Sequence, residues 1–312
     1  MIIDAHCHLF REDWLPQGFW EEFAGFLAAA SARQGRALSP EKVREELLPS
    51  LWDPTGEKQI RAMDEAGINV AAVVLLDYGL LYGEPPVPIE EQNRQLAVLA
   101  QRWPGRLLPF VGVDPRRKGA VELLERGVKA WGMRGLKIHP SAGFYPNGPE
   151  AYALFEVAQR LDIPVATHTG MIMGSLKARY SHPLHLDDVL SDFPRLKLIA
   201  VHLGDTRGAY WPEVASLAWM RPNLYLDLCG WQGMARRNYP AFCQILRSVL
   251  DIAGADRLLL GTDGPVNRAV LSDREWVALI RELPQKAPAG LTFRQEEVEA
   301  ILGGNARRLF GM

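Results

Sequence analysis

The sequence predicts one α/β domain over residues 1–312, a (β/α)8 TIM barrel with a helical insertion after its first strand. Eight short apolar segments alternate with helical patterns along the chain. From the third onward they begin 26, 30, 33, 27 and 34 residues apart, which is close to the length of a βα unit. Their near-continuous Val, Ile and Leu content is typical of parallel strands that helices cover. The predicted strands are 2–8, 68–76, 107–114, 133–139, 163–169, 196–203, 223–229 and 257–263.

Helical patterns follow these strands. In 149–161, Tyr152, Phe155 and Leu161 can form an apolar stripe, and Pro149 suits a first helical turn. A doubly wound open sheet is the alternative fold, but neither Gly-x-Gly-x-x-Gly nor a P-loop follows any strand. The predicted helices are 57–66, 89–103, 118–131, 149–161, 186–193, 210–220, 240–253 and 273–283.

Residues 10–52 separate the first strand from its expected helix. We expect two helices here, about 18–33 and 40–49, the second opened by Ser39 and Pro40. An insertion after a barrel strand lies on the face that carries the active site, so the segment is a candidate lid or substrate wall. A packing or dimer element is the alternative.

The amino-acid composition limits the kinds of partner that we expect for this protein. A net charge of −2 gives no electrostatic case for nucleic acid or an anionic membrane. There is no run of about 20 apolar residues to span a bilayer. The three cysteines form no Cys-x-x-Cys motif, which favours a reduced, cytoplasmic setting. We expect no signal peptide, because its cleavage would remove His6 and His8. A small-molecule substrate is expected, and a homo-oligomer is possible.

The first strand carries half of a metal site. In Ile2-Ile3-Asp4-Ala5-His6-Cys7-His8, alternate residues point to the same face of a strand. His6 and His8 therefore project together, with Asp4 below them, and Cys7 faces the other way. An isolated His-x-His pair is common, so the prediction depends on the rest of the chain.

Three of the remaining histidines and two further polar residues strengthen this prediction. In a TIM barrel the catalytic groups lie at the C-terminal ends of the strands. Imidazoles and a carboxylate suit Zn²⁺, or another divalent ion, which can make a bound water nucleophilic at neutral pH. The residues at predicted strand ends are His6, His8, Lys137, His139, His168, His202 and Asp263.

Six motifs in strand order give the chain a family resemblance. They are D-A-H-C-H, G-L-K-I-H-P, P-V-A-T-H-T-G, I-A-V-H-L-G-D, L-L-G-T-D-G-P and the terminal G-G-N-A-R-R-L-F-G. Together they resemble the amidohydrolase superfamily, and most closely the amidohydrolase 2 branch, which includes aminocarboxymuconate semialdehyde decarboxylase and related lactonases. The resemblance covers the whole chain. It implies His6, His8, His168 and Asp263 as metal ligands, Asp263 also as a catalytic proton acceptor, and His202 as a catalytic residue beside the metal-bound water.

Lys137 leaves the number of metal ions open. In binuclear members of the superfamily a strand-four lysine is carboxylated and bridges two metals, and the strand-six histidine binds the second ion. Lys137 and His202 supply those residue types here. The branch that the chain resembles most usually holds one metal, so we expect one ion and an unmodified Lys137.

Other residues have weaker cases. Asp205 is a candidate for substrate contact or for orienting His202, and a turn or helix cap explains it as well. Trp231 and Tyr145 follow strands and are candidates to line a substrate pocket, although aromatic packing is the ordinary role of such residues. His139, just before Pro140, is expected to be structural or to support the ligands from behind.

These features predict a metal-dependent hydrolase that uses a zinc-activated water on an amide, lactone or ester-like carbonyl of a small molecule. The first alternative is a nonoxidative decarboxylase of an unsaturated or aromatic carboxylate, a carbon–carbon lyase working on the same metal site. A catalytically silent, ligand-binding barrel is the second alternative. It is disfavoured because every ligand position is kept.

Overall fold

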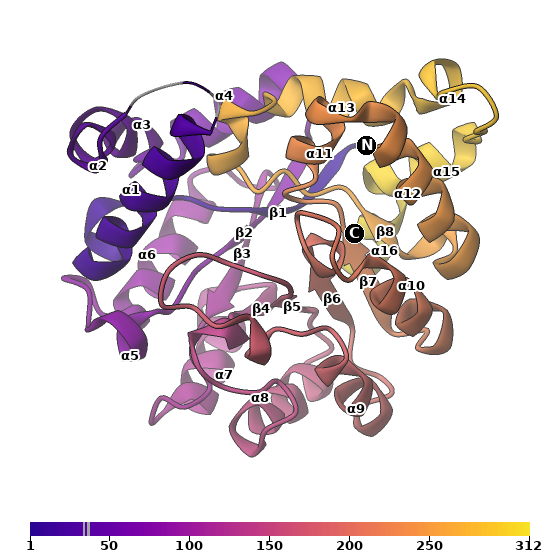
Figure 1. Ribbon diagram of the computed structural model, residues 1–312. Helices are drawn as coiled ribbons and strands as arrows, with labels where there is room; N and C mark the ends of the chain where they lie inside the picture. The colour runs from indigo at the N-terminus through magenta and orange to yellow at the C-terminus, as the bar shows by residue number, and fades with distance from the viewer. Residues whose placement is uncertain (34, 36–37) are drawn as a thin grey trace.

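A computed structural model describes residues 1–33, 35 and 38–312. Eight parallel strands follow one another in chain order around the centre of the molecule, and helices surround them (Figure 1). This confirms the predicted (β/α)8 barrel. The strands are β1 (Ile3–Cys7), β2 (Val70–Val74), β3 (Leu107–Gly112), β4 (Gly135–Ile138), β5 (Val165–His168), β6 (Leu198–Val201), β7 (Leu224–Asp227) and β8 (Leu258–Leu259).

The helices that cover the barrel lie within a few residues of the predicted segments. Five short helices, α5, α11, α14, α15 and α16, come in addition. The α-helices are α1 (Gln17–Ala32), α2 (Pro40–Lys42), α3 (Leu48–Leu51), α4 (Glu57–Ala66), α5 (Gly79–Tyr82), α6 (Ile89–Gln101), α7 (Ala120–Trp131), α8 (Pro149–Arg160), α9 (His185–Asp192), α10 (Trp211–Met220), α11 (Gln232–Arg237), α12 (Tyr239–Ala253), α13 (Asp273–Arg281), α14 (Leu283–Lys286), α15 (Gln295–Glu299) and α16 (Asn305–Leu309).

The seam between the first and last strands is irregular. The predicted strand 257–263 is regular only at Leu258–Leu259, because the chain beyond it turns away, and Asp263 has a φ of +51°. Backbone hydrogen bonds still join this segment to β1, so the barrel closes. They run from Ala5 N to Leu260 O (2.7 Å), from Asp263 N to His6 O (2.9 Å) and from His8 N to Gly264 O (2.7 Å).

The barrel interior has its own apolar core. Side chains from several strands fill it, among them Val70, Phe110 and Ile199. Phe310, just after α16, packs edge to face on Phe110 and joins this cluster, as does Leu309 of α16. The filled interior leaves the polar strand ends as the place for a site.

The insertion 10–52 packs on loops that follow the strands. Phe19 of α1 contacts Tyr78, which follows β2, with ring centroids 5.1 Å apart. Glu22 accepts hydrogen bonds from the Tyr82 hydroxyl (2.6 Å) and from the Ser175 backbone N–H (2.7 Å) in the loop after β5. The segment therefore lies at the C-terminal rim of the barrel, where a lid or substrate wall would have to be.

The predicted helix 40–49 is less regular than its pattern suggests. The Ser39 side chain caps its start by accepting from Lys42 N. A π-helical turn at Val43–Leu47 then precedes α3. Pro49 has no backbone N–H to donate to the preceding turn, which explains a widened turn just before it. The predicted end of the first helix, Arg33, lies one residue beyond α1.

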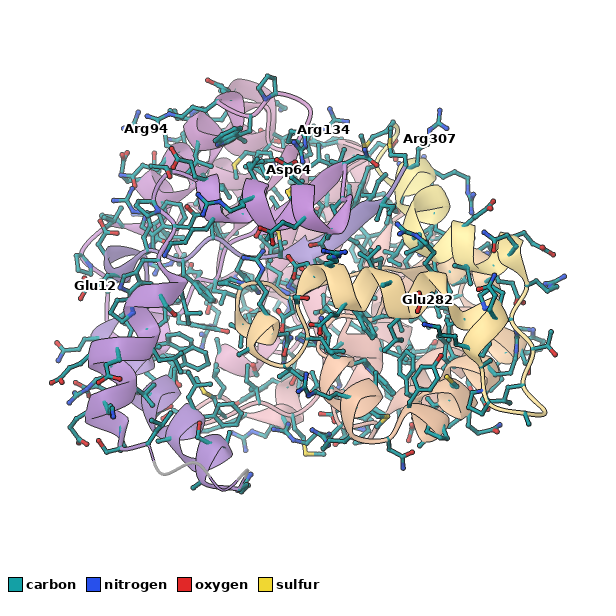
Figure 2. All side chains as sticks on the ribbon, turned by 90° about the horizontal axis from the view of Figure 1, so that it is seen from above. Glu12, Asp64, Arg94, Arg134, Glu282 and Arg307 are labelled. Carbon is teal, nitrogen blue, oxygen red and sulfur yellow. The ribbon has the colours of Figure 1, made fainter. Side chains whose placement is uncertain are left out.

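Charged side chains are concentrated on the outer layer. Figure 2 shows Arg94 on α6 and Asp64 on α4 at the periphery of the molecule. Arg94 pairs with Glu91 and Asp64 with Arg106 at the surface. Among the described residues, no helix has the length and apolar character needed to cross a membrane.

Candidate metal centre

The end of β1 and the turn after β8 bring three potential ligand atoms together. The Nε2 atoms of His6 and His8 lie 3.3 Å apart. Asp263 Oδ1 lies 3.3 Å from His8 Nε2 and 3.9 Å from His6 Nε2. All three ligand atoms are within 4.8 Å of one another, so they could hold one metal ion.

The outer nitrogens of both imidazoles are already bound to the protein. His8 Nδ1 donates to the carbonyl of Val74 at 3.1 Å. His6 Nδ1 donates to Asp227 Oδ2, also at 3.1 Å. These partners place the proton on Nδ1 and leave a lone pair on each Nε2. Two lone pairs that face each other at 3.3 Å repel unless a cation lies between them, so this donor set fits a metal ion.

Asp263 is held in a backbone conformation that side chains rarely adopt, with a φ of +51°. Its second oxygen, Oδ2, accepts from Asn267 Nδ2 at 2.9 Å. Burial acts to raise the pKa of this carboxyl, but a hydrogen bond from His8 in its protonated form and the charge of the neighbouring imidazoles outweigh burial and lower the pKa to about 2. A metal ion bound by the same nitrogens would supply that positive charge in place of the protons. Asp263 is therefore an anion at neutral pH, as a ligand or proton acceptor must be.

Three more imidazoles form the opposite side of the site. The rings of His139 and His168 stack with centroids 4.0 Å apart, and His168 meets His202 edge to face at 4.8 Å. Burial first, and neighbouring cationic groups second, hold the pKa values of His139 and His168 well below the ordinary value. His168 Nε2 is buried without a hydrogen-bond partner among the described residues. Such an orphaned nitrogen is what an absent ligand or metal ion would satisfy.

His202 begins the turn after β6, and its φ of +69° is also unusual. Its Nδ1 donates to the carbonyl of Cys229 at 3.1 Å, and Trp231 Nε1 donates to its carbonyl at 2.7 Å. Gly230 makes this approach possible, because a Cβ there would lie 2.4 Å from Thr206 Cγ2 and 3.2 Å from His202 Nδ1. Within the part of the chain that the structure describes, His202 Nε2 makes no hydrogen bond.

Lys137 lies at the end of β4, only 2% exposed. Its Nζ is 3.5 Å from His6 Nε2. Burial lowers the pKa of the amine to about 8, against the opposing effect of Cys229, Asp227 and Asp263. A buried lysine that forms no ion pair with any described residue is energetically expensive, which indicates a functional reason for its presence.

The structure brings all the predicted metal-site residues to one end of the barrel. Their ligand atoms do not all lie equally close to one another. His168 lies outside the group of three converging atoms in the part of the chain that is described. His139, expected to be structural or supporting, stacks directly on His168, and its Nδ1 shares a 2.7 Å hydrogen bond with Ser141 Oγ.

The three predicted substrate-binding residues have other contacts. Asp205 is fully buried and accepts from the backbone N–H groups of Met171 (2.8 Å) and Arg207 (2.7 Å), as a turn cap does. Trp231 is buried and supports the backbone of His202. Tyr145 is 44% exposed and packs on Tyr180 and His185. In these positions all three stabilise the loops around the site.

Residues that sequence reasoning missed also reach the centre. Asp227 binds His6, and the Cys229 thiol lies 3.2 Å from His6 Nδ1 and 3.0 Å from His202 Nδ1. Both lie within the predicted strand 223–229, so an acidic residue near a strand's C-terminal end was the available signal.

Tyr78 is 2% exposed and meets His139 edge to face. Its only sequence signal was its place after a strand.

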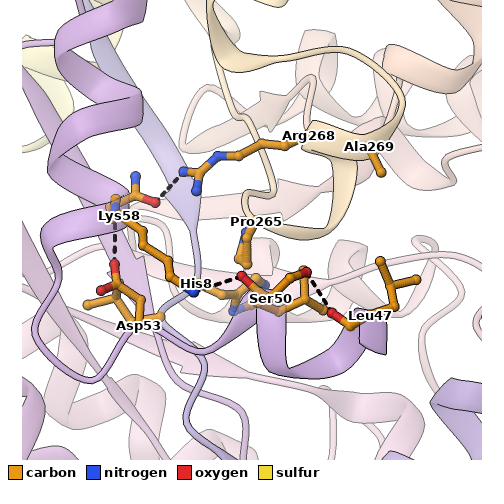
Figure 3. Close-up of a pocket in the computed structure, with 11 residues that line it drawn as sticks. His8, Leu47, Ser50, Asp53, Lys58, Pro265, Arg268 and Ala269 are labelled. Atoms are coloured by element: carbon orange, nitrogen blue, oxygen red, sulfur yellow. Dashed lines mark hydrogen bonds between the residues drawn. The ribbon is translucent and has the colours of Figure 1, made fainter. Parts of the chain in front are cut away.

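A cavity of about 290 Å³ adjoins His8 (Figure 3). It lies between α3 of the insertion, the start of α4 and the loop after β8. Lys58, Arg268 and Asp53 are its charged lining residues, and Leu47 and Pro265 are apolar. The charge of Arg268 is matched by Asp273, which lies 2.9 Å away. The insertion thus forms part of a wall next to a candidate metal ligand, and Phe10 stacks on the His8 ring with centroids 5.4 Å apart.

Known structures share this architecture. An uncharacterized TIM-barrel protein from Bordetella bronchiseptica is 21% identical, with a TM-score of 0.67, over 99% of this chain and 98% of that one. A dihydroxybenzoic acid decarboxylase from Polaromonas sp. JS666, with bound manganese and the inhibitor 2-nitroresorcinol, is 20% identical, with a TM-score of 0.65, over 99% and 96%. A probable 2-pyrone-4,6-dicarboxylic acid hydrolase from Acinetobacter baumannii, with citric acid bound, is 16% identical, with a TM-score of 0.63, over 100% and 99%. At these identities the likeness establishes the fold.

Sequence comparison gives the family. A stretch of 101 residues is 34% identical to protein fluG of Emericella nidulans; it makes up 32% of this chain and only 11% of that much longer protein. The family model described as amidohydrolase (Amidohydro_2) matches residues 3–312, nearly the entire chain. The protein therefore belongs to the amidohydrolase family of enzymes.

Proposed function

We propose that this enzyme binds one divalent metal ion, through His6, His8, His168 and Asp263, and hydrolyses an amide, lactone or ester-like carbonyl of a small molecule. The observation that carries the proposal is the convergence of His6 Nε2, His8 Nε2 and Asp263 Oδ1 within 4.8 Å. The unpartnered nitrogen of His168 supports a fourth ligand on the opposite side.

The donor set suits Zn²⁺, and another divalent ion such as Mn²⁺ is compatible with it. When bound, the ion would lower the pKa of a coordinated water and polarise the substrate carbonyl. Asp263, which is ionised at neutral pH, can take up a proton. His202 has its Nδ1 committed to the Cys229 carbonyl, so its Nε2 can hold or deliver a proton on the other side.

One ion is favoured over two because the branch that the chain resembles usually holds one, and Lys137 Nζ, 3.5 Å from His6 Nε2, is placed so that it could serve either arrangement. A carboxylated Lys137 would place a bridging carboxylate there, and His202 would then serve a second ion. Mass spectrometry of the native protein separates the two cases, since carboxylation adds one CO₂. We expect the unmodified mass.

A nonoxidative decarboxylase is the second candidate. It is supported by the fold neighbours that act on hydroxylated aromatic acids, among them the manganese-containing enzyme from Polaromonas. The same ligands would serve such a reaction. An ionised Asp263 is needed as a metal ligand in either reaction, so its charge does not decide between them, and the products formed must do so.

We further propose that the substrate is enclosed between the metal centre and the insertion 10–52, acting as a wall or lid. The insertion's contacts with the loops after β2 and β5 support this, as does the cavity beside His8. A small organic molecule fits a space of this size.

The test begins with metal analysis of the purified protein, followed by removal of the metal with a chelator and reloading with Zn²⁺ or Mn²⁺. Each form is then assayed on lactones, amides and hydroxybenzoates, in water enriched in ¹⁸O. Hydrolysis would transfer ¹⁸O to the product carboxyl group, whereas decarboxylation would release CO₂ and leave no new carboxyl group. Turnover by fully metal-free protein would refute the metal-dependent mechanism.

A further inference from the structure

Asp227, the last residue of β7, occupies a central place behind the candidate metal site. It is fully buried, and its only ion pair among the described residues is with His6. Its Oδ1 accepts the backbone N–H groups of His202 (2.7 Å) and Cys229 (3.2 Å). Its Oδ2 faces His6 Nδ1 at 3.1 Å. One carboxylate thus touches the side chain of a candidate ligand and the backbone of a candidate catalytic residue.

These contacts set the proton position on His6. A carboxylate can only accept, so His6 Nδ1 must carry the hydrogen that lies between the two groups. The lone pair is then on Nε2, which points toward His8 Nε2 and Asp263 Oδ1. The opposite tautomer would direct an N–H at the place where a metal ion needs a lone pair.

We propose that Asp227 is a positioning residue: it holds His6 in the metal-binding tautomer and, through the same carboxylate, ties that ligand to His202. This inference rests on the proposed metal site. It assigns a role to a residue that would not touch metal or substrate. Partners of this kind typically change metal affinity by about 10–100-fold when they are removed.

The link to His202 matters because its backbone is strained. A φ of +69° is rarely adopted by a residue other than glycine and persists only where neighbours enforce it. The 2.7 Å hydrogen bond from His202 N to Asp227 is one such constraint. Movement of Asp227 would therefore displace both the ligand and the histidine beside it.

Asparagine cannot replace Asp227 in this role. Two backbone N–H groups point at Oδ1, so the amide introduced by Asp227→Asn must keep its oxygen there. The NH₂ group of that amide would then face His6 Nδ1 as a donor. His6 could accept that hydrogen bond only by moving its own proton to Nε2, the wrong nitrogen for metal binding. The change alters neither the size of the side chain nor the His202 contact.

Cys229 offers a matched control, because its thiol lies 3.2 Å from the same His6 nitrogen. A carboxylate is a much stronger acceptor than a sulfur atom, so Asp227 should dominate. Cys229→Ala removes the competing neighbour and leaves Asp227 in place.

The experiment measures Zn²⁺ affinity by competition with a chromophoric chelator in the wild type, Asp227→Asn and Cys229→Ala. We expect affinity to fall about 10–100-fold in Asp227→Asn and by less than about threefold in Cys229→Ala. Co²⁺-loaded Asp227→Asn should also show an altered visible absorption spectrum. Equal affinities in wild type and Asp227→Asn, or a larger loss in Cys229→Ala, would overturn the role of Asp227 while leaving the metal site intact.

A second measurement needs no variant and covers the case in which Asp227→Asn does not fold. Nitrogen NMR of metal-free, ¹⁵N-histidine-labelled wild type reports which ring nitrogen of His6 carries the proton. A protonated Nδ1 is expected, and a protonated Nε2 would overturn the inference. If the wild type itself bound no divalent ion, the proposed function would fail together with it.

Discussion

On the β1–β8 side of the barrel mouth the ligand atoms of His6, His8 and Asp263 converge, whereas on the β4–β6 side, the stacking side, His139 stacks on His168 and His168 meets His202 edge to face. His6, His8 and Asp263 lie within 4.8 Å through their ligand atoms. His139, His168 and His202 are related by ring contacts of 4.0 and 4.8 Å. Both sides consist of buried, polar groups at strand ends, so the difference must come from how the backbone holds them.

The converging side has the more constrained backbone. His6 lies in β1 and His8 directly follows that strand, and Asp263 is joined to it by the hydrogen bond from its own N–H to the His6 carbonyl. The stacking side draws each ring from a different strand. We infer that the first side is preorganised for a metal ion, and that the second supplies one further ligand and the proton-transfer group.

The largest effect should come from Asp263→Asn. This change keeps the size of the side chain and removes both the charged ligand and the proton acceptor. We expect turnover to fall by on the order of 10⁴-fold or more, beyond the ordinary loss for one proton-transfer group. Steady-state kinetics with circular dichroism as the folding control provide the check. Near-normal turnover would mean that the converging side is not the reactive one.

The second test concerns His202 on the stacking side. In His202→Ala the three converging donors are untouched, so about one equivalent of metal should remain bound. Turnover should still fall by roughly 10²–10⁴-fold if His202 transfers a proton. Metal content is measured on the same sample as kcat. A variant that loses its metal would instead make His202 a ligand.

His168→Ala, compared with His8→Ala, tests directly whether the two sides of the barrel mouth contribute unequally to metal binding. If the β1–β8 side binds the ion and His168 completes its coordination, the His168 change should weaken metal affinity by more than the about 10–100-fold typical of losing a supporting contact. His8→Ala should weaken it further. Chelator competition on both variants gives the ratio, and equal losses would remove the distinction between the two sides.

The smallest effect is expected from Lys137→Met, which removes a buried amine between the two sides. Because the pKa of Lys137 is lowered from 10.5 to about 8, the folded metal-free protein bears the cost of a buried charge below pH 8. Lys137→Met should therefore raise the stability of the metal-free protein by about 1–3 kcal/mol at pH 7.

That advantage should shrink between pH 8 and 10.5, where wild type releases the proton on folding. Thermal unfolding across this pH range is the measurement. A gain that does not change with pH would show that packing, and not the charge of Lys137, is responsible.

The sequence determined the class of fold and most of the site's members. Alternation along a strand is a local property, so His6 and His8 could be assigned to one face from a few residues of sequence. The regular βα spacing then placed Lys137, His168, His202 and Asp263 at the same end of a barrel without any coordinates.

Tertiary structure decided which of these groups meet and what holds them. Asp227 and His6 are 221 residues apart in sequence, and their contact exists only because the barrel brings β7 near β1. The φ angles of His202 and Asp263, the stacking of His139 on His168 and the short regular part of β8 depend likewise on neighbours from other strands. The local sequence pattern indicates to which face of a strand a side chain points. Only the closure of the barrel sets the distances between side chains from different strands. Those distances determine which side chains can share a metal ion or a proton.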